Sequence, residues 1–402
     1  MTRKCTFNKL LILALSFNIF TETASAQWSQ IASMGTGPND GCISFSLHGK
    51  GYVGGGSSGS KFYEYDTTAN TWTMKGNAPG NKIRAFGFSF VANGKGYAGC
   101  GDTTGANNPT ADMWMYNDTT NTWTQKASFP GGGRDAMFCF MINDTAYVGG
   151  GFAGTAGMSD FYKYNPFTDT WTALSALPMG AIGFPVSFVI SNKGYVATGQ
   201  VGSAESTGLW QYDPITNAWT TKASFPGAAR QAAFGYALNN FGYVGGGMVG
   251  YTSVFNDMWR YNAITNTWSA DQNFPSLYPA WSCVFTLGGT AYVGTGSYFT
   301  TGLVATDSFK RYRGVANPAL GIVEANQNKY IELYPNPVND YLTITGNVEP
   351  GAKISINDLT GREVKTVTFT GNNLYIGDLQ KGTYILRCMN GNDVCTEKLV
   401  KQ

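Results

Sequence analysis

Residues 88–130 read FSFVANGKGYAGCGDTTGANNPTADMWMYNDTTNTWTQKASFP. Phe88 opens this stretch, a glycine-rich run follows it, and Tyr116, Trp123 and Pro130 then stand seven residues apart. Apolar residues alternate along short runs that Gly, Asn and Pro separate, which is typical of antiparallel strands. No part of the stretch has helical periodicity. The expected strands are 84–91, 96–101, 112–116 and 122–125.

The same markers recur in a fixed order along the chain. Six tryptophans are spaced 44, 51, 48, 48 and 49 residues apart: Trp28, Trp72, Trp123, Trp171, Trp219 and Trp268. A tyrosine stands seven residues before each of the last five: Tyr65, Tyr116, Tyr164, Tyr212 and Tyr261. A phenylalanine marks the first strand of each unit: Phe45, Phe88, Phe138, Phe188, Phe234 and Phe285. A repeat of about fifty residues with four strands indicates units that stack face to face around an axis.

The strand count predicts how such a ring closes. The phenylalanine, glycine and tyrosine strands each occur six times, whereas one tryptophan strand stands alone at Trp28. We therefore expect the N-terminal strand to complete the sheet formed by 281–287, 290–296 and 306–313. This pairing would join the two ends of the ring and leave no unpaired edge there.

A glycine doublet, then a tyrosine, six residues and a tryptophan resembles the kelch repeat over residues 27 to about 313. The resemblance implies an all-β protein whose first domain is a six-bladed kelch-type β-propeller. Kelch propellers include sialic-acid mutarotases and galactose oxidase. The copper site of galactose oxidase uses two histidines, and His48 is the only one in this chain, so we exclude that activity.

The composition excludes further classes of protein. The 402 residues carry a net charge of +2, and nucleic-acid binding requires a clear basic surplus. One histidine cannot supply a metal site with two imidazole ligands, so no metal is expected. Residues 54–59, 149–154 and 245–250 fit G-x-G-x-x-G, but a strand rather than a helix follows each. We therefore expect no dinucleotide and no other cofactor.

The first 26 residues have the pattern of a secretory signal peptide. Arg3, Lys4 and Lys9 precede an apolar run, and small residues lead to a cleavage site between Ala26 and Gln27. The apolar run is too short for a permanent membrane span. Removal of residues 1–26 leaves 24 basic and 24 acidic residues in the chain.

After a linker at 314–328, the pattern changes to short alternating strands over 329–402, which indicates a small Ig-like β-sandwich. This region resembles the type A C-terminal sorting domain of the type IX secretion system of the Bacteroidota. The residues that carry the resemblance are Pro335, Asn336, Pro337, Gly361, Gly382 and Tyr384. The resemblance implies the type IX secretion machinery as a partner, passage through the periplasm, and a secreted or surface location. A permanent carbohydrate-binding or Ig-like module is the alternative.

Cys388 and Cys395 flank a turn within this domain. If Gly391 and Asn392 are the centre of the turn, the two cysteines face each other and a disulfide is feasible. A shift of the turn centre by one residue would separate them, so both outcomes stay open.

Loop lengths point to one face of the ring as the binding face. The connections after the glycine strands vary in length, and function often lies on the variable loops of a fixed scaffold. Counting four residues back from each marker phenylalanine places six residues at the mouth of the central channel: Gly41, Arg84, Arg134, Phe184, Arg230 and Trp281. Arginines beside aromatic residues predict a site for a carboxylate or an acidic sugar. In the alternative, each arginine pairs with a carboxylate such as Asp135 or Asp40 and ties neighbouring units together.

Three functional classes follow. The first, which we favour, is a secreted or surface binding protein that recognises a glycan or a protein on this rim. The second is a mutarotase-like or epimerase-like enzyme acting on an acidic sugar, with Glu205 as general base. The third is a structural surface or biofilm component. We assign no catalytic residue, because a nucleophilic triad needs a well-placed histidine.

Overall fold

The computed structural model describes residues 27–105, 107–275, 280–299, 303–313, 331–346, 348, 351–358, 362–371, 373–390 and 393–402. In these residues the regular structure is β, apart from one 3-10 turn, η1 (Pro79–Asn81). The expectation of an all-β protein is therefore confirmed. The expected signal peptide with Ala26, the linker 314–328 and Gly361 lie outside the described residues.

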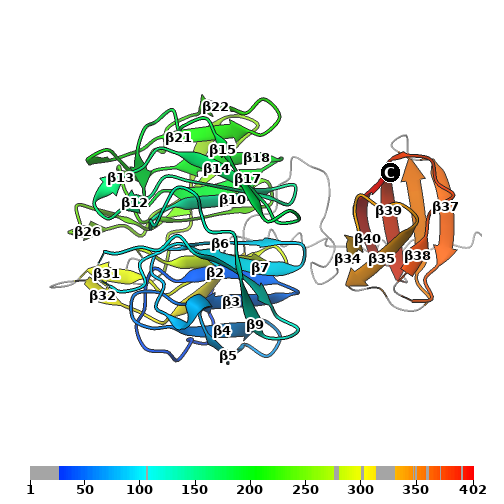
Figure 1. Cartoon of the computed structure of the whole chain (residues 1–402), viewed down its shortest axis with the longest axis horizontal. Coiled ribbons are helices and arrows are strands. Elements are labelled where there is room, and N and C mark those ends of the chain that lie inside the picture. Colours follow the sequence, from blue (N-terminus) through cyan, green and yellow to red (C-terminus); the bar gives the residue numbers. More distant parts are fainter. Residues whose placement is uncertain are drawn as a thin grey trace, which may run out of the picture.

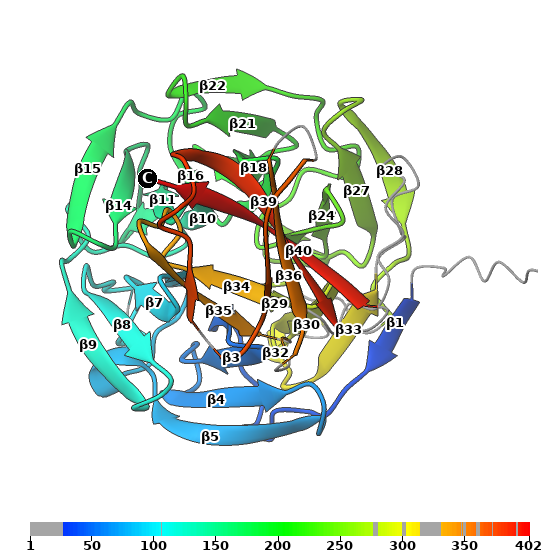
Figure 2. The ribbon, with the colours of Figure 1, turned by 90° about the vertical axis from the view of Figure 1, so that its right-hand side faces the viewer.

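Six four-stranded antiparallel sheets form the first domain and lie side by side around one axis (Figure 2). Sheet 1 contains β2 (Ile43–Leu47), β3 (Lys50–Gly54), β4 (Lys61–Asp66) and β5 (Thr71–Asn77). Sheet 2 contains β6 (Phe88–Ala92), β7 (Lys95–Gly99), β8 (Met113–Asn117) and β9 (Thr122–Lys126). Sheet 3 contains β10 (Phe138–Ile142), β11 (Thr145–Gly149), β14 (Phe161–Asn165) and β15 (Thr170–Leu174).

The other three sheets have the same order of strands from the axis outward. Sheet 4 contains β17 (Val186–Ile190), β18 (Lys193–Ala197), β21 (Leu209–Asp213) and β22 (Ala218–Thr221). Sheet 5 contains β23 (Phe234–Leu238), β24 (Phe241–Gly245), β27 (Met258–Asn262) and β28 (Thr267–Asp271). Sheet 6 contains β29 (Cys283–Leu287), β30 (Thr290–Gly294), β33 (Phe309–Arg313) and, as its outer strand, the N-terminal β1 (Gln27–Gln30).

Short hairpins follow the second strand of several sheets. They are β12 (Phe152–Ala153) with β13 (Ala156–Gly157), β25 (Met248–Val249) with β26 (Ser253–Val254), and β31 (Ser297–Phe299) with β32 (Leu303–Ala305). In sheet 4 the hairpin of β19 (Gln200–Val201) and β20 (Ala204–Glu205) also pairs with β16 (Ile182–Gly183). Figure 1 shows β12, β13, β26, β31 and β32 at one end of the ring, which we call the loop end.

The innermost strands enclose a central cavity of about 390 Å³. Hydroxyl groups on this wall are already bonded: Ser44 Oγ donates to the Val284 carbonyl at 2.8 Å, and Ser89 Oγ donates to the Ser44 carbonyl at 2.7 Å. These bonds join the inner strands of neighbouring sheets. They satisfy backbone carbonyl groups of inner strands, which do not pair with the inner strands of neighbouring sheets.

One aromatic residue at the centre of each inner strand stacks on a tyrosine of the second strand. The stacked pairs are Phe45–Tyr52, Phe90–Tyr97, Phe140–Tyr147, Phe188–Tyr195, Tyr236–Tyr243 and Phe285–Tyr292. Several of these rings also press on a glycine of the next sheet. A Cβ atom at Gly96 would lie 2.4 Å from the ring of Phe45, and one at Gly51 would lie 2.3 Å from the ring of Phe285. The spacing between sheets therefore depends on glycine at these positions.

In sheets 1, 3 and 5, side chains of the outer strands and their turn connect the sheet to the one before it. Tyr65 donates a hydrogen bond to Asn70 Oδ1, and Asn70 Oδ1 also accepts the amide of Ala32, which follows β1. Trp72 Nε1 donates to the Ala32 carbonyl at 2.9 Å. The same two bonds join Ala127 to Trp171 and Asp169, and Ala223 to Trp268 and Asn266. These side chains are thus structural parts of the interface between sheets.

Two smaller sheets form the C-terminal domain. The first contains β34 (Ile331–Tyr334), β35 (Tyr341–Gly346) and β38 (Asn373–Tyr375). The second contains β37 (Glu363–Thr368), β36 (Lys353–Asp358), β39 (Gly382–Asn390) and β40 (Asp393–Lys401). Their apolar residues form one core that includes Leu342, Ile354, Ile376, Leu386 and Leu399.

Replacing Gly96 with alanine tests the spacing between sheets 1 and 2. The added Cβ overlaps the buried ring of Phe45, so we expect Gly96→Ala to lower the free energy of unfolding by about 1–3 kcal/mol. Gly59→Ala is the matched control, because no described atom lies within 4 Å of the Cβ that alanine adds there. Urea unfolding measures both variants, and equal stabilities would contradict the assigned packing.

Candidate functional site

A closed ring of six backbone hydrogen bonds surrounds the axis at the loop end. Each bond runs from an amide just before one inner strand to the equivalent carbonyl of the preceding sheet, with N···O distances of 2.8–3.1 Å. The six residues, one from each sheet, are Gly41, Phe86, Ala136, Phe184, Ala232 and Trp281. Trp281 accepts from Gly41, so the series returns to its starting point. We call these residues the axial ring.

Every residue of the axial ring has a left-handed backbone, with φ between 50° and 61°. This conformation costs a residue other than glycine on the order of 1 kcal/mol, more for a bulky side chain. The hydrogen bond on each side of the residue holds it there. At Gly41 the glycine is also required by space, because a Cβ would lie 2.6 Å from the ring of Phe86.

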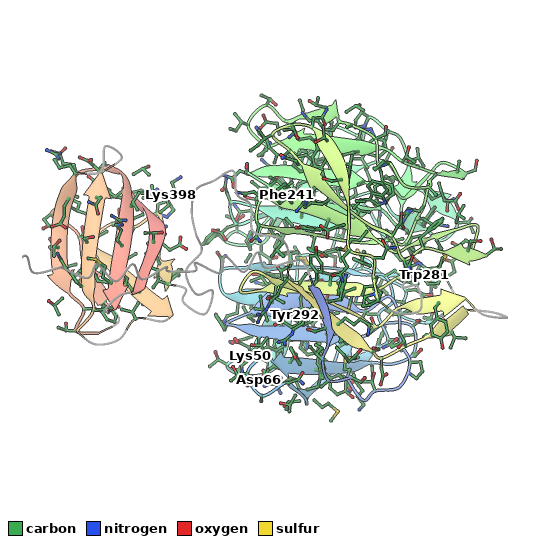
Figure 3. The ribbon with its side chains drawn as sticks, turned by 180° about the vertical axis from the view of Figure 1, so that it is seen from behind. Lys50, Asp66, Phe241, Trp281, Tyr292 and Lys398 are labelled. Atoms are coloured by element: carbon green, nitrogen blue, oxygen red, sulfur yellow. The ribbon has the colours of Figure 1, made fainter. Side chains whose placement is uncertain are left out.

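Large and small side chains alternate around the axial ring. Sheets 2, 4 and 6 contribute Phe86, Phe184 and Trp281, and the ring contains only glycine or alanine between them. The three aromatic rings contact one another, with centroid distances of 5.2 Å, 5.6 Å and 6.1 Å. They meet over the channel as a half-buried aromatic cluster, and Figure 3 shows Trp281 at the end of the ring opposite Lys50 and Asp66.

In three of the six sheets, the phenylalanine that was taken from the sequence as the repeat marker lies two residues before the equivalent position. Phe88, Phe138 and Phe234 start their inner strands, whereas Phe45, Phe188 and Phe285 occupy the central position of theirs. The true equivalents in sheets 2, 3 and 5 are Phe90, Phe140 and Tyr236, which stack on the second strand. Residues two apart on a strand face the same side, so alternation alone does not distinguish them.

This shift removes the three arginines from the mouth of the channel. Arg84, Arg134 and Arg230 lie two residues before the axial ring and are each 0% exposed. Each forms a bidentate ion pair within its own sheet, with Asp112, Asp160 and Asp257 respectively. The prediction that these guanidinium groups line an open anion site is therefore wrong. The alternative is right that the arginines are paired, but the partners are not Asp135 or Asp40, and the ion pairs lie within single sheets and do not tie neighbouring units together.

The buried ion pairs serve the structure around the mouth. Burial raises the pKa of Asp112, but hydrogen bonds and charge from Arg84 outweigh burial and hold that pKa at about 2. The Arg84 carbonyl also accepts the amide of Gly56 in sheet 1 at 2.9 Å. Removing one partner of such a pair typically costs about 3–5 kcal/mol, because the other charge stays buried and unpaired.

A second group of side chains gathers beside the aromatic cluster. Tyr251, in the turn of the β25–β26 hairpin, is 49% exposed and its ring lies 5.9 Å from that of Trp281. Burial raises the pKa of the Tyr251 hydroxyl, a hydrogen bond with Gln231 opposes this, and the charges of Glu205 and Asp135 raise it further. Gln231, Glu205 and Asp135 thus all act on the Tyr251 hydroxyl, and the Glu205 carboxylate bonds the amide of the adjacent Gly250. We call Tyr251, Gln231, Glu205, Asp135 and Trp281 the mouth cluster.

Two polar groups of the mouth cluster lack a described partner. Gln231 is 1% exposed and its Oε1 has no hydrogen bond, and the buried Nε1 of Trp281 has none either. Asp135 is 8% exposed, and its carboxyl group accepts a hydrogen bond from its own backbone amide. Glu205 is engaged: its Oε1 accepts the amide of Gly250 at 3.0 Å, which ties the hairpins of sheets 4 and 5 together. Unsatisfied buried polar groups are uncommon in folded proteins, and a water molecule or a bound ligand is a way to satisfy them.

Sequence reasoning placed Phe184, Trp281 and Glu205 in this region but missed Phe86, Tyr251 and Gln231. The Phe-x-Phe pattern of sheets 2 and 3 was the available signal for Phe86. Either phenylalanine of the pair fits the repeat, and counting four residues back from the second one, Phe90, gives Phe86. Tyr251 lies in a hairpin of variable length, where no repeat position exists to mark it. His48 lies in the β2–β3 turn, 2.6 Å from Asp118, and takes no part in the mouth cluster.

The sorting residues of the C-terminal domain hold its last strand. Asn336 Oδ1 accepts the amide of Val400 at 2.8 Å, and its Nδ2 donates to the Lys398 carbonyl at 2.6 Å. Pro335 and Pro337 flank Asn336 and have no amide to offer, so the side chain makes these bonds. Tyr384, two residues after Gly382, donates to the Gln380 carbonyl.

The backbone register places Cys388 directly opposite Cys395 in the β39–β40 hairpin. The turn centre is therefore the one that brings the two cysteines face to face. The side chain of Cys395 lies outside the described residues, and the disulfide stays a prediction.

No helix among the described residues is long and apolar enough to cross a membrane. In the same part of the chain, no group of three or more His, Cys, Asp or Glu side chains is arranged to hold a metal ion.

The pH dependence of stability tests the surroundings of Asp135. Burial and the nearby charge of Asp102 raise the Asp135 pKa to about 6. The folded protein therefore binds more protons than the unfolded chain between about pH 4 and pH 6, and its stability falls as pH rises through this window. We expect Asp135→Asn to exceed the parent in unfolding free energy by about 1–2 kcal/mol above pH 6, and by little at pH 4.

Asp66→Asn is the control for this measurement. Hydrogen bonding from Lys50, 2.5 Å away, lowers the pKa of Asp66 to about 2, so this carboxylate stabilises the folded state above about pH 4. Its variant should be less stable than the parent at neutral pH, the opposite sign. Unfolding at a series of pH values decides, and an Asp135→Asn profile parallel to the parent would contradict the raised pKa.

A comparison with solved structures finds a similarity to one described as "Structure of YjhT", with a TM-score of 0.61 and 18% sequence identity. The similar region covers 70% of this chain and 96% of that one. At this identity the similarity concerns the fold alone, and it supports a β-propeller-like fold for the first domain. None of the curated proteins matches the chain in sequence.

A comparison with protein families finds one match. Residues 332–402 match the family described as "Secretion system C-terminal sorting domain". The expectation of a sorting domain at this end of the chain is confirmed. The C-terminal region thus matches a sorting domain, which indicates export of the protein to the cell surface by the type IX secretion system.

Proposed function

We propose that this protein is an exported glycan-binding protein whose ligand occupies the mouth cluster. In this proposal the signal peptide is cut between Ala26 and Gln27, and the six sheets are the blades of a kelch-type β-propeller that the N-terminal strand closes. The sorting domain then directs the propeller through the type IX machinery. The propeller presents its loop end to the ligand.

The observation that carries the proposal is the pairing of partly exposed aromatic faces with unsatisfied polar groups. Trp281 and Tyr251 offer ring faces on which a sugar ring can lie. Beside them, Trp281 Nε1 is a donor and Gln231 Oε1 an acceptor without a partner among the described residues, the two kinds of group that sugar hydroxyls satisfy. A concave apolar surface with a few converging polar groups is the usual form of a small-ligand site.

The two alternatives receive less support. An enzyme for acidic sugars was expected to use the three arginines, and their side chains are buried in ion pairs. Glu205 accepts a hydrogen bond from the Gly250 amide, which ties the hairpins of sheets 4 and 5 together, so this carboxylate has a structural role. A purely structural role does not require the partly exposed aromatic faces of Trp281 and Tyr251 at the loop end.

A glycan array probed with the exported protein and with Trp281→Ala tests the proposal. Loss of the tryptophan removes a stacking face and the indole donor, so we expect the affinity for the bound glycan to fall about tenfold or more. Phe167→Ala is the matched control, because Phe167 is an exposed aromatic in the β14–β15 turn, outside the mouth cluster. It should bind as the parent does.

Binding of the parent to no glycan, or equal binding by parent and Trp281→Ala, would contradict the proposal. Circular dichroism and thermal unfolding of the variant establish that it is folded. Tyr251→Ala is a second variant that should also lose glycan affinity. It should fold as the parent does, because this half-exposed residue in a hairpin turn contributes little to the core.

A further inference from the structure

The sign of the charge at the mouth is opposite to the one that the arginines suggested. The guanidinium groups of Arg84, Arg134 and Arg230 are buried and neutralised by aspartates. In the described part of the chain, no lysine or arginine pairs with the carboxylate of Asp135 or Glu205. The mouth cluster therefore presents uncompensated negative charge.

Asp135 is the most informative of these groups. It directly precedes Ala136 of the axial ring, and its main chain forms two hydrogen bonds with Phe152, at 2.9 and 3.1 Å. Its carboxyl group accepts a hydrogen bond from its own backbone amide, and no lysine or arginine of the described residues pairs with it. Asp102 is the other nearby carboxylate, and it accepts hydrogen bonds from three backbone amides of its own loop, those of Thr104, Gly105 and Asn107. A buried carboxylate without a cation is costly unless a ligand supplies one.

The neighbouring groups define what such a ligand looks like. The faces of Tyr251 and Trp281 attract a cation as well as an apolar ring face. Among the described residues, Gln231 Oε1 is a free acceptor, so a ligand that satisfies it has an N–H or O–H group. Trp281 Nε1 is a free donor in the same part of the chain, so the ligand also has an oxygen atom that accepts a hydrogen bond.

We infer that the mouth cluster binds a sugar that carries a protonated amine, with the ammonium group between Asp135 and Glu205 and the sugar ring against Trp281 and Tyr251. The inference rests on the proposed function and adds the class of sugar. The raised pKa of Asp135 is consistent with it, since a carboxyl group that lacks a counter-ion in the free protein gains one on binding. Acidic sugars are repelled by the same two carboxylates.

Calorimetric titration of the full exported chain at pH 7 tests this inference with three sugars of similar size. The probes are glucosamine, N-acetylglucosamine and glucuronate, whose charges are positive, neutral and negative. We expect glucosamine to bind at least about tenfold more tightly than N-acetylglucosamine, because only the amine pairs with the carboxylates. Glucuronate should not bind, and added salt should weaken the glucosamine complex.

Two variants assign the selectivity to the carboxylates. Asp135→Asn should reduce glucosamine affinity about tenfold and leave N-acetylglucosamine unchanged. Glu205→Gln keeps the acceptor for the Gly250 amide and should also lose affinity for glucosamine alone. Asp66→Asn, an acidic residue on the hairpin turn of sheet 1, is the control and should bind all probes as the parent does.

The outcomes separate this inference from the proposed function. Tight binding of N-acetylglucosamine or glucuronate that Trp281→Ala abolishes would overturn the amine inference and keep the glycan proposal. Equal glucosamine affinity in the parent and Asp135→Asn would also overturn it. If no probe and no glycan of the array binds the parent, both are overturned.

Discussion

The closed ring of backbone hydrogen bonds at the axis is the constraint on which the rest of the first domain depends. It uses one amide and one carbonyl from each of six sheets, and it includes the bond that joins sheet 6 to sheet 1 through Gly41 and Trp281. A closed series has no free end from which to open. It also forces six residues into the left-handed region, at a cost that only a surrounding rigid structure sustains.

The ring determines where the functional side chains lie. Its alternating large and small residues bring Phe86, Phe184 and Trp281 together above the cavity. In sheets 3 and 5, the residue before the ring position bonds the hairpin of its own sheet: Asp135 bonds Phe152, and Gln231 bonds Met248. The rigid axial ring and the variable hairpins are therefore connected through the residues that directly precede the ring positions. This is the arrangement in which a rigid scaffold presents a binding site on its loops.

The class of fold was accessible from the sequence, because alternation, turn residues and the spacing of tryptophans act locally. The all-β class and the sorting domain are confirmed. The alignment at the mouth was not accessible in the same way: Phe88 and Phe90 face the same side, and only cross-strand stacking on Tyr97 identifies the equivalent residue. A shift of two residues exchanged a buried arginine for a half-buried phenylalanine at the mouth.

The charge of the mouth was missed for a related reason. The aspartates that neutralise the arginines stand 26–28 residues further along the chain, after a connection of variable length, so no local pattern links the partners. Once they are paired, the remaining carboxylates of Asp135 and Glu205 set the sign. The chemistry of this site therefore follows from pairing in three dimensions, which residue types alone do not reveal.

Amide hydrogen exchange of the axial ring tests the central claim most directly. The account predicts that the amides of Gly41, Phe86, Ala136, Phe184, Ala232 and Trp281 exchange together and only through global unfolding, because a closed ring does not fray. The Gly41 amide is the decisive one, since it spans the junction between the last sheet and the first. Fast exchange there, with protection at the other five, would show an open ring and contradict the account.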